Sequence, residues 1–254
     1  MKGITALVLT LNEEKNIEEC LQTLLWADKL IVLDSGSSDR TVEIAWRMGA
    51  EVFFHPFQNY ADQRNFALQL VQTDWVLFID ADERVTPELA QEIREAVEKE
   101  SICGWWIPRK NYICGRWVRH GGWYPDYQLR LLRPEKAHYD SAWEVHEIVV
   151  VEGGTGYLRH HIIHYNYRTW PEFIARQKVY LPLEVRTLRK RGIKAKPWSP
   201  FSMPLREFWR RYFKLEGYKD GLYGLILALA MAFYTMLAYT QLFLSSFRLK
   251  EPRA

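Results

Sequence analysis

Cysteine is scarce in this chain of 254 residues. The three present, Cys20, Cys103 and Cys114, are odd in number and show no C-x-x-C spacing. This pattern argues against a disulfide framework and against a zinc site, and it favours a reducing compartment. The first apolar run, residues 4–11, is short and meets acidic residues at once, so we expect a strand there rather than a signal peptide.

The common phosphate-binding patterns are missing too. The chain contains no G-x-G-x-x-G and no G-x-x-x-x-G-K-[ST], so it is not an ordinary dinucleotide-binding protein or P-loop enzyme. It has no internal repeat and no low-complexity tract. Charged residues make up 26%, which is ordinary for a globular protein. Aromatic residues are frequent at 15%, which suits a sugar-binding or membrane-facing surface, or a large core.

The net charge of +3 conceals an uneven distribution. Residues 186–219 contain eleven Lys and Arg but only two Asp and Glu, a local charge of +9. Residues 221–247 then follow without a charged side chain. A helix of that length measures about 40 Å, against roughly 30 Å of bilayer hydrocarbon. We predict that residues 169–254 form a helical, membrane-associating region, which spans the membrane, re-enters it or lies in its interface. The alternative is a core or dimerisation helix.

The first hundred residues alternate strand and helix patterns. Continuous apolar runs predict buried strands at 4–11, 29–34, 51–55 and 75–80. Helices are expected between and after them, with N-caps at Asn12, at Ser37 or Ser38, and at Thr86, and with a further helix over 59–71. This β-α-β-α order predicts a parallel sheet with right-handed crossovers.

Beyond residue 100 the pattern changes. Strands joined by Gly-rich loops, at 103–109, 127–134, 146–151 and 157–165, predict a mixed or antiparallel extension of the sheet. A helix over 169–192, broken or kinked near Pro182, is expected next. A Pro-rich link at 196–204 and a basic aromatic helix at 205–214 complete the pattern. The predicted fold class is α/β, with a mixed, mostly parallel sheet flanked by helices. The expected domains are residues 1–100, 101–168 and 169–254.

Polar clusters follow three of the predicted strands, at residues 10–14, 34–41 and 80–83. Open parallel sheets bind ligands outside the carboxyl ends of their strands. Asp34 can accept a hydrogen bond from a base N–H. Asp80 and Asp82 are two positions apart, so an extended chain places both carboxylates on one side, with Ala81 opposite. Two hard oxygen donors suit the Mg²⁺ or Mn²⁺ that a nucleotide diphosphate needs.

Together these segments resemble the family 2 glycosyltransferases, which have the GT-A (Rossmann-like) fold. The matching pieces are VLTLNEEKNIEECLQTL, IVLDSGSSDRTVEIA, ADQRNFAL and WVLFIDADE, in the family's order. The resemblance implies transfer of a sugar from a nucleotide donor, usually with inversion at the anomeric carbon. The whole chain is similar to the subgroup near the lipopolysaccharide-core β-1,4-glucosyltransferases. That similarity implies a UDP-hexose donor, with glucose favoured, and a lipopolysaccharide-core, polysaccharide or lipid-linked acceptor.

The resemblance also implies roles for single residues. The residues implied to bind the nucleotide-sugar are Thr10, Leu11, Glu13, Asp34, Arg64, Asp80 and Ala81. Asp82 is implied to bind the metal, and the cofactor is therefore a divalent cation, Mn²⁺ or Mg²⁺. His164 either reaches the metal or diphosphate, or is a packed, hydrogen-bonded histidine. The implied location is cytoplasmic, at the inner face of the cytoplasmic membrane. No nucleic-acid partner is expected, and a homo-oligomer is left open.

An inverting transfer needs a base that takes the proton of the acceptor hydroxyl. Candidates lie in SAWEVHEIV, where Glu147 is favoured, His146 is a supporting neighbour and Glu144 is the alternative. The family usually carries an acidic pair after the metal motif, and this chain has His-Glu instead. A surface strand with alternating charges would leave all three without a catalytic role.

Two rival functions use similar residues. A nucleotidyltransferase also uses strand-end carboxylates and a metal, but it usually has a Gly-rich, basic loop after the first strand, where this chain has acidic NEEKN. A non-catalytic, membrane-bound nucleotide-sugar binder would not need Asp80, Asp82 and a candidate base together. The Q-x-x-R-W motif of processive synthases is absent, and QLRLL at 128–132 matches it only loosely, which favours addition of a single sugar.

Overall fold

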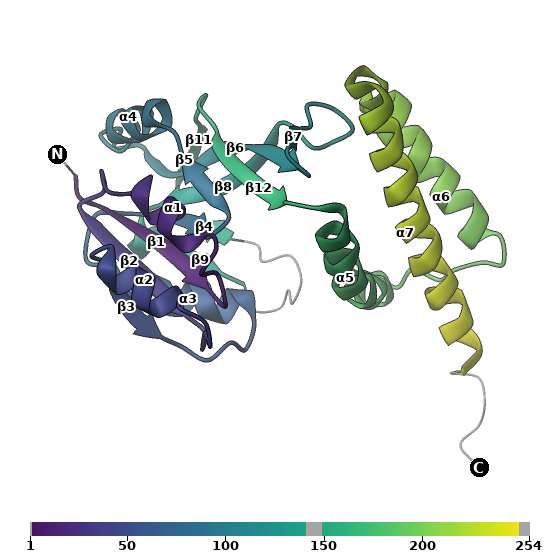
Figure 1. The fold of residues 1–254 in the computed structure, drawn as a ribbon, viewed down its shortest axis with the longest axis horizontal. Helices are drawn as coiled ribbons and strands as arrows, with labels where there is room; N and C mark the ends of the chain where they lie inside the picture. Colours follow the sequence, from purple (N-terminus) through teal and green to yellow (C-terminus); the bar gives the residue numbers. More distant parts are fainter. Residues whose placement is uncertain (1, 141–148, 249–254) are drawn as a thin grey trace, which may run out of the picture. The chain divides into compact units, whose positions relative to one another are not determined.

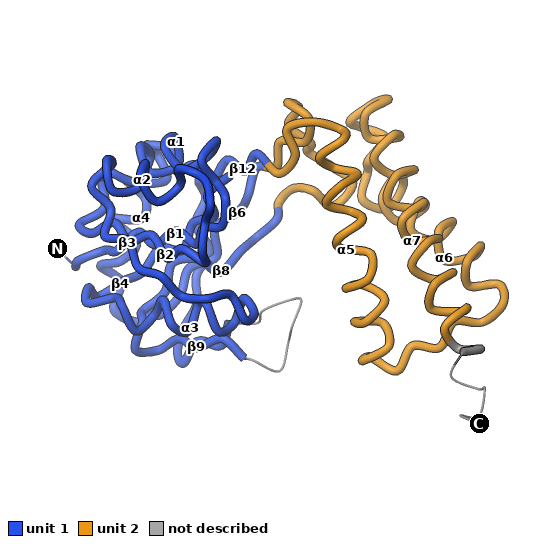
Figure 2. Tube along the Cα trace, turned by 60° about the horizontal axis from the view of Figure 1, so that its bottom comes forward, with its two compact units in different colours: residues 1–110, 126–165 blue, residues 111–125, 166–254 orange. Residues whose placement is uncertain are grey.

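The computed structural model describes residues 2–140 and 149–248. The chain folds into two compact units: unit 1 is residues 1–110 and 126–165, and unit 2 is residues 111–125 and 166–254 (Figure 2). The strands are β1 (Ile4–Thr10), β2 (Lys29–Asp34), β3 (Glu51–Phe54), β4 (Trp75–Asp80), β5 (Glu83–Val85), β6 (Ile102–Ile113), β7 (Arg116–Trp117), β8 (Asp126–Leu132), β9 (Ala137–Tyr139), β10 (Val149–Val151), β11 (Gly154–Tyr157) and β12 (Ile162–Tyr167). The α-helices are α1 (Ile17–Gln22), α2 (Thr41–Arg47), α3 (Tyr60–Leu70), α4 (Pro87–Ala96), α5 (Trp170–Lys190), α6 (Ser199–Trp209) and α7 (Gly221–Arg248).

Unit 1 is built on a mixed sheet with the strand order β3-β2-β1-β4-β8-β6-β12-β5 (Figure 1). The strands β1 to β4 are parallel, and β1 lies between β2 and β4. β8 pairs with β4 and β6 in the antiparallel direction, and β12 pairs antiparallel with β5. Antiparallel strands therefore extend a parallel half, as the sequence predicts.

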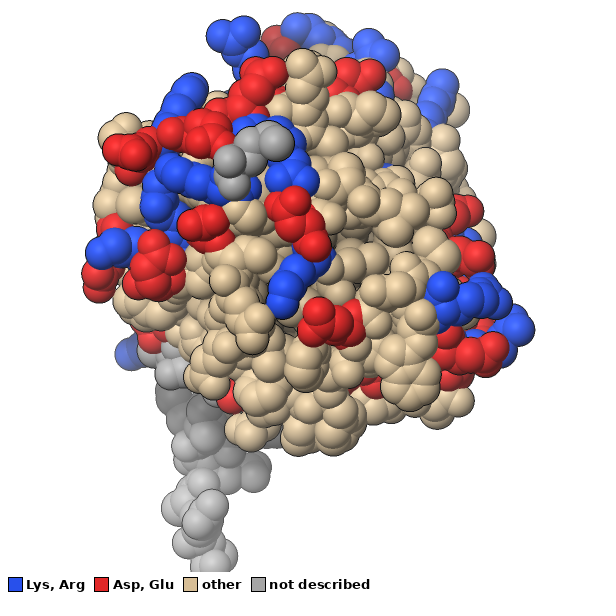
Figure 3. Space-filling model, turned by 90° about the vertical axis from the view of Figure 1, so that its left-hand side faces the viewer, with Lys and Arg blue, Asp and Glu red and all other residues tan. Residues whose placement is uncertain are grey.

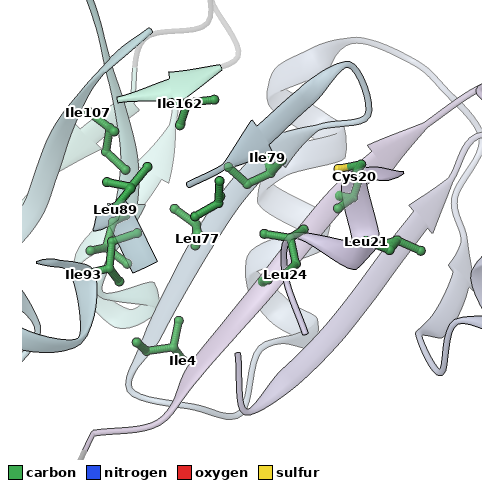
Figure 4. Close-up of a cluster of buried hydrophobic side chains, with 14 of the residues drawn as sticks. Ile4, Cys20, Leu21, Leu24, Leu77, Ile79, Leu89, Ile93, Ile107 and Ile162 are labelled. Atoms are coloured by element: carbon green, nitrogen blue, oxygen red, sulfur yellow. The ribbon is translucent and has the colours of Figure 1, made fainter. Parts of the chain in front are cut away.

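Alternation along β1 explains why helices cover both faces of the sheet. Ile4, Ala6 and Val8 belong to a buried cluster with residues of α1, α2 and α4, while Leu7 belongs to a second cluster with residues of α3. Successive side chains of a strand point to opposite faces, so a strand covered on both sides is expected to be apolar along nearly all of its length. Figure 4 shows the first cluster, in which side chains of α1 and α4 converge on those of β4.

Two of the helices begin later than their predicted caps. α1 starts at residue 17 and α2 at residue 41, and neither has a side chain that caps its first turn. The predicted caps Asn12, Ser37 and Ser38 instead form bonds between two loops of the candidate site. Thr86 does cap α4, because its hydroxyl accepts from a backbone amide in the first turn.

Unit 2 is mainly helical. α5 runs through Pro182 as one helix of 21 residues, so the helix is not broken there. The predicted Pro-rich link is partly wrong, since α6 begins at Ser199 with Pro200 in its first turn. Proline is tolerated there because the first amides of a helix have no helical acceptor. Both α5 and α6 pack along α7.

α7 is long and apolar, but little of it is covered. The most apolar 18-residue stretch within residues 217–245 has a mean hydropathy of 1.8, and 28% of that stretch is buried. By length and composition such a helix can cross a membrane. A core helix of a soluble protein would be mostly buried, so this low burial argues against the core alternative.

Charged side chains of both signs are interspersed on the face of the molecule shown in Figure 3. They lie over its upper and left parts and at its right edge, some of them near the middle, and an area without charge extends to the lower margin. Mixed charge of this kind is typical of an ordinary solvated surface.

Candidate active site

Three neighbouring parallel strands bring predicted site residues to one edge of the sheet. Thr10 lies opposite Asp34 in the pairing of β1 with β2, and Leu9 lies opposite Asp80 in the pairing of β1 with β4. β1 is therefore flanked by the two aspartates that end β2 and β4. This carboxyl edge is where open α/β sheets bind their ligands.

Asp34 is buried and organises the turn after β2. Its carboxylate accepts hydrogen bonds from the hydroxyls of Thr10 and Ser37, and from the amides of Gly36 and Ser37 at 2.8 and 2.7 Å. Gly36 has a φ of 104°, a conformation that side chains disfavour. A carboxylate offers about four acceptor positions, so Thr10 and the turn together occupy all of them. A base N–H can bond to Asp34 only if one of the two hydroxyls rotates away.

The loop after β1 is tied to the same turn. The Asn12 side-chain oxygen accepts from the backbone amide of Ser38 at 2.9 Å. The backbone amide of Asn12 donates to the Ser37 hydroxyl at 2.8 Å. The Glu13 amide donates to the Thr41 hydroxyl at 2.8 Å. Asn12 has a positive φ of 56°, which asparagine tolerates better than most residues. These bonds fix two loops at the predicted nucleotide edge.

Within these loops the predicted contacts differ in exposure. Leu11 is 50% exposed, whereas Thr10 is buried and bonded to Asp34. The Glu13 carboxylate accepts from the side-chain amide of Asn16 at 2.7 Å. Leu11 thus offers accessible apolar surface at this edge, while Thr10 and Glu13 help to hold the loops.

Asp80, the last residue of β4, is paired with two arginines. Both guanidinium nitrogens of Arg130 donate to its carboxylate, at 3.1 Å and 2.5 Å, and Arg64 donates at 3.3 Å. Burial alone would raise the pKa of Asp80, but the charges of Arg130 and Arg64 outweigh it and hold that pKa well below its ordinary value. Asp80 is therefore a fixed, ionised acceptor at the strand end.

Glu83 is fully buried and completes this network. One of its oxygens accepts from the Asp80 amide at 2.9 Å, and the other accepts from Arg109 at 3.3 Å and Arg130 at 3.4 Å. Arg109 also pairs with Asp126 at 2.6 Å. A buried carboxylate is tolerated when it is paired and hydrogen-bonded, so Glu83 has a structural task.

Arg84 holds the turn between β4 and β5 against α1. Its guanidinium donates to the carbonyls of Ala81 and Glu83 at 2.9 and 2.8 Å, and to the Asn16 carbonyl and the Glu19 carboxylate at 3.1 Å each. The Ala81 side chain is buried in the core. Ala81 therefore offers only its main chain to the site, and its carbonyl is already used by Arg84.

Asp82 and His164 meet on the other side of this turn. β12 returns antiparallel to β5 and places His164 opposite Glu83. The Asp82 carboxylate then lies 3.5 Å from His164 Nε2, and both residues are buried. The Tyr165 amide donates to the Asp82 carbonyl at 3.0 Å, which fixes the register of the two segments. A residue from the end of unit 1 is thus brought to the D-x-D turn.

This pair fits the predicted divalent cation. It offers one hard carboxylate oxygen and one imidazole nitrogen, and two neighbouring ligands of one such ion are roughly 3 Å apart. In residues 2–140 and 149–248, no three His, Cys, Asp or Glu side chains form a larger cluster. A cation held here would take its remaining ligands from phosphate oxygens and water, as Mg²⁺ usually does.

The candidates for the catalytic base cannot be placed at the site. Glu144, His146 and Glu147 lie in residues 141–148, outside the described residues. Their roles as base, supporting neighbour and alternative base remain predictions.

Sequence reasoning missed two residues that the structure places at the centre of the site, Arg109 and Arg130. Arg130 is 6% exposed and stands in the apolar run Leu129 to Leu132. A single cation inside a buried strand needs a buried carboxylate, so this run contained a signal. It did not say which carboxylate, because the pairing of β8 with β4 is needed for that.

The comparison with protein families decides the identity. The pattern described as "Glycosyl transferase family 2" matches residues 5–165, more than half of the chain. This chain belongs to glycosyl transferase family 2. The matched segment ends at Tyr165, the last residue of unit 1, so the family's region contains every described residue of the site above.

Individual relatives agree with this family. The chain is 28% identical over 249 residues to a lipopolysaccharide core biosynthesis glycosyltransferase of Rhizobium meliloti (strain 1021), covering 94% of this chain and 92% of that protein. It is 43% identical over 93 residues to an uncharacterized glycosyltransferase of Rickettsia bellii (strain RML369-C), covering 36% of this chain and 32% of that protein. The predicted family and the likeness to the lipopolysaccharide-core subgroup are confirmed.

Among solved structures, the crystal structure of mannosyl-3-phosphoglycerate synthase from Rubrobacter xylanophilus matches with a TM-score of 0.50 and 18% identity, over 77% of each chain. At that identity the likeness concerns the fold alone. The predicted GT-A architecture of this glycosyltransferase, a mixed sheet flanked by helices and followed by an apolar C-terminal helix, is confirmed.

Proposed function

We propose that this glycosyltransferase transfers a single hexose from a UDP-sugar, with inversion, to a lipopolysaccharide-core, polysaccharide or lipid-linked acceptor. UDP-glucose is the first donor to test. The observation that carries the proposal is the Asp82–His164 pair, 3.5 Å apart, beside the arginine-paired Asp80 at the carboxyl edge of the parallel strands.

Asp80 is suited to hold the ribose. Its Oδ1 accepts from both Arg64 and Arg130, whereas its Oδ2 accepts only from Arg130 among the described residues. A carboxylate oxygen accepts two bonds, so Oδ2 has room for a ribose hydroxyl. The side chain is 34% exposed, which leaves that oxygen within reach of a ligand.

Asp82 and His164 would hold the divalent cation. When bound, such an ion neutralises charge that develops on the leaving diphosphate. The acceptor hydroxyl oxygen forms a bond to the anomeric carbon as the bond from that carbon to the diphosphate breaks, and UDP leaves. Glu147 is proposed to take the hydroxyl proton, with His146 beside it and Glu144 as the alternative. Inversion follows because attack and departure occur on opposite faces of the sugar.

We place the enzyme at the inner face of the cytoplasmic membrane. Unit 2 contains the segment with a local charge of +9, and α7 follows with few buried residues. Basic residues attract anionic lipids, and an uncovered apolar helix is stabilised by lipid. Such a location would bring unit 1 to acceptors that are themselves anchored in the membrane.

The test is a reaction of the full chain with a panel of UDP-hexoses, Mn²⁺ and a cell-envelope extract, read by mass spectrometry of the product. We expect a mass gain of one hexose and release of UDP. Calorimetry should show that UDP binding needs the metal and that Asp82→Asn weakens it at least tenfold. Asp74→Asn, at the opposite end of β4, is the matched control and should leave binding unchanged.

Each rival predicts a different result. A nucleotidyltransferase would attach a nucleotide to the acceptor and release diphosphate, which mass spectrometry distinguishes from hexose transfer. A non-catalytic binder would bind UDP and yield no product with any donor. UDP binding that ignores both EDTA and Asp82→Asn would refute the metal role.

A further inference from the structure

Unit 2 contains a pocket that takes no part in the proposed transfer. It has a volume of about 280 Å³ and lies between the β7 region and the segment that precedes α7. Three basic residues line it, Arg116, Arg119 and Lys219, together with the rings of Trp117 and Tyr223. All of these residues belong to unit 2.

Two of the three cations lie over aromatic rings. Neither Arg116 nor Arg119 forms an ion pair with a carboxylate among the described residues. Arg119 lies over the Trp117 ring at 4.1 Å, and Arg116 lies over the Tyr223 ring at 5.4 Å. An aromatic face orients a guanidinium without neutralising it. The pocket therefore presents two oriented, unneutralised guanidinium groups.

The acidic residue at the pocket is otherwise engaged. The Asp220 carboxylate accepts from the backbone amides of Arg119 and His120, at 3.2 and 2.8 Å, and contacts the His120 ring at 3.2 Å. Lys219 is paired with Glu216 at 2.7 Å. Asp220 thus shapes the wall that carries Arg119, and the pocket as a whole stays positive. Guanidinium groups bind phosphate oxygens in a bidentate manner, so a phosphate is the ligand that suits this pocket.

An exposed apolar stripe starts beside the pocket. Leu222, Ile226, Leu229 and Phe233 of α7 are 72%, 40%, 53% and 51% exposed. Their spacing of three and four residues places them on one face of the helix. A ligand that joins a phosphate to acyl chains would match the pocket and this stripe together, whereas a soluble phosphate would use only the pocket.

We infer that this pocket binds the phosphate of a membrane lipid, with the acyl chains along the exposed face of α7. The inference builds on the proposed membrane location and gives it a defined headgroup contact. It goes beyond nonspecific attraction, because two particular arginines must contribute more than other surface arginines of the same unit.

The experiment compares two double variants of the full chain. Arg116→Gln with Arg119→Gln removes the pocket charges, and Arg189→Gln with Arg191→Gln removes two exposed charges elsewhere in unit 2. Both lower the net charge equally. On vesicles of phosphatidylcholine with one fifth phosphatidylglycerol, we expect the pocket variant to bind at least about tenfold more weakly than the control variant. On pure phosphatidylcholine the choline cation offsets the phosphate charge, so the difference between the two variants should be smaller. Both variants should keep the parent's circular dichroism spectrum and UDP affinity.

Soluble probes separate the lipid from a free phosphate and from the membrane location. Short-chain phosphatidylglycerol, below its micelle concentration, should bind the parent chain more tightly than glycerophosphoglycerol, and the pocket variant should lose that binding. If the deacylated probe binds equally well, the pocket takes a soluble phosphate and the lipid assignment is wrong. Equal losses in the two double variants would also overturn it. A parent chain that ignores all vesicles but binds the short-chain lipid would refute only the membrane location.

Discussion

Replacing Arg130 by Met should destabilise unit 1 strongly at neutral pH. Arg130 is buried and donates to two carboxylates, Asp80 at 3.1 and 2.5 Å and Glu83 at 3.4 Å. Methionine fills most of the same volume but brings no charge. The change therefore isolates the electrostatic part of the cluster.

The size of this destabilisation depends on the partners that Asp80 and Glu83 keep in the variant. Removing one partner of a buried ion pair costs about 3–5 kcal/mol, because the other charge stays buried. Here Asp80 keeps Arg64 and is partly exposed, and Glu83 keeps Arg109. We therefore expect the low end, about 3 kcal/mol. For a domain of this size, that corresponds to a fall of about 6–12 °C in the apparent Tm, measured by intrinsic fluorescence.

The pH dependence gives a second, independent result. The pKa of Asp80 lies well below its ordinary value of 3.8 in the folded protein. Its contribution to stability is therefore present above about pH 4 and is lost as the pH falls through the folded pKa, because the unfolded chain takes up the proton first. In Arg130→Met the pKa of Asp80 returns toward 3.8. The gap in Tm between parent and variant should be full at pH 7 and should narrow below about pH 4.

Two further variants complete this test. Arg159→Met removes an exposed arginine of unit 1 and should change the Tm by little. Glu83→Gln combined with Arg130→Met removes charge from both sides of one contact, so the double variant should be less destabilised than the sum of the two single variants. If Arg130→Met is as stable as Arg159→Met, or if the Tm gap between parent and Arg130→Met is constant with pH, this would falsify the stabilising electrostatic role given to the cluster.

Three other outcomes are expected. Glu147→Gln should lower kcat by about 100-fold or more and leave the affinities for UDP and Mn²⁺ intact. Glu144→Gln should lower kcat much less. If the two variants show the reverse, the base is Glu144. Gly36→Ala should weaken UDP binding and destabilise unit 1 by about 1 kcal/mol, because alanine is strained at a φ of 104°. Gly49→Ala, at a φ of 83° outside the site, should keep UDP affinity. Equal UDP affinities in the two variants would contradict the role of the turn after β2. Phe201→Ser removes a ring that is 73% exposed on α6 and should weaken binding to phosphatidylcholine vesicles about tenfold without lowering the Tm; unchanged flotation would show that α6 does not enter lipid.

Sequence patterns predicted the parallel half of the fold because burial on two faces leaves little choice of residue. β1, β2 and β4 are mostly apolar, and the pairing of β1 with both β2 and β4 makes their carboxyl ends neighbours. The meeting of Thr10, Asp34 and Asp80 follows from that topology. His164 was a predicted metal ligand by resemblance, and only the return of β12 places it beside Asp82.

The arginine partners of Asp80 and Glu83 could not be predicted from the sequence, for a different reason. Arg130 lies 50 residues after Asp80, and Arg109 lies 26 residues after Glu83. The order and register of antiparallel strands depend on long-range packing, which periodicity does not encode. Competing side-chain hydrogen bonds also explain why Asn12 and Ser38 do not cap helices as predicted. Asn12 and Ser38 satisfy one another across two loops, and such side-chain bonds are as favourable as a helix cap.

The arginine–carboxylate cluster has a consequence for how the protein should behave without the proposed metal. Arg64, Arg109 and Arg130 supply three positive charges, and Asp80, Glu83 and Asp126 supply three negative ones. The cluster is electrically balanced from within the chain, so the strand ends do not depend on an added ion to offset repulsion. Stripping the metal should therefore be a reversible event: chelated protein keeps its Tm and regains activity when Mn²⁺ is restored. Unlike a zinc finger, the protein should stay folded without the proposed metal and should take it up again when Mn²⁺ is added.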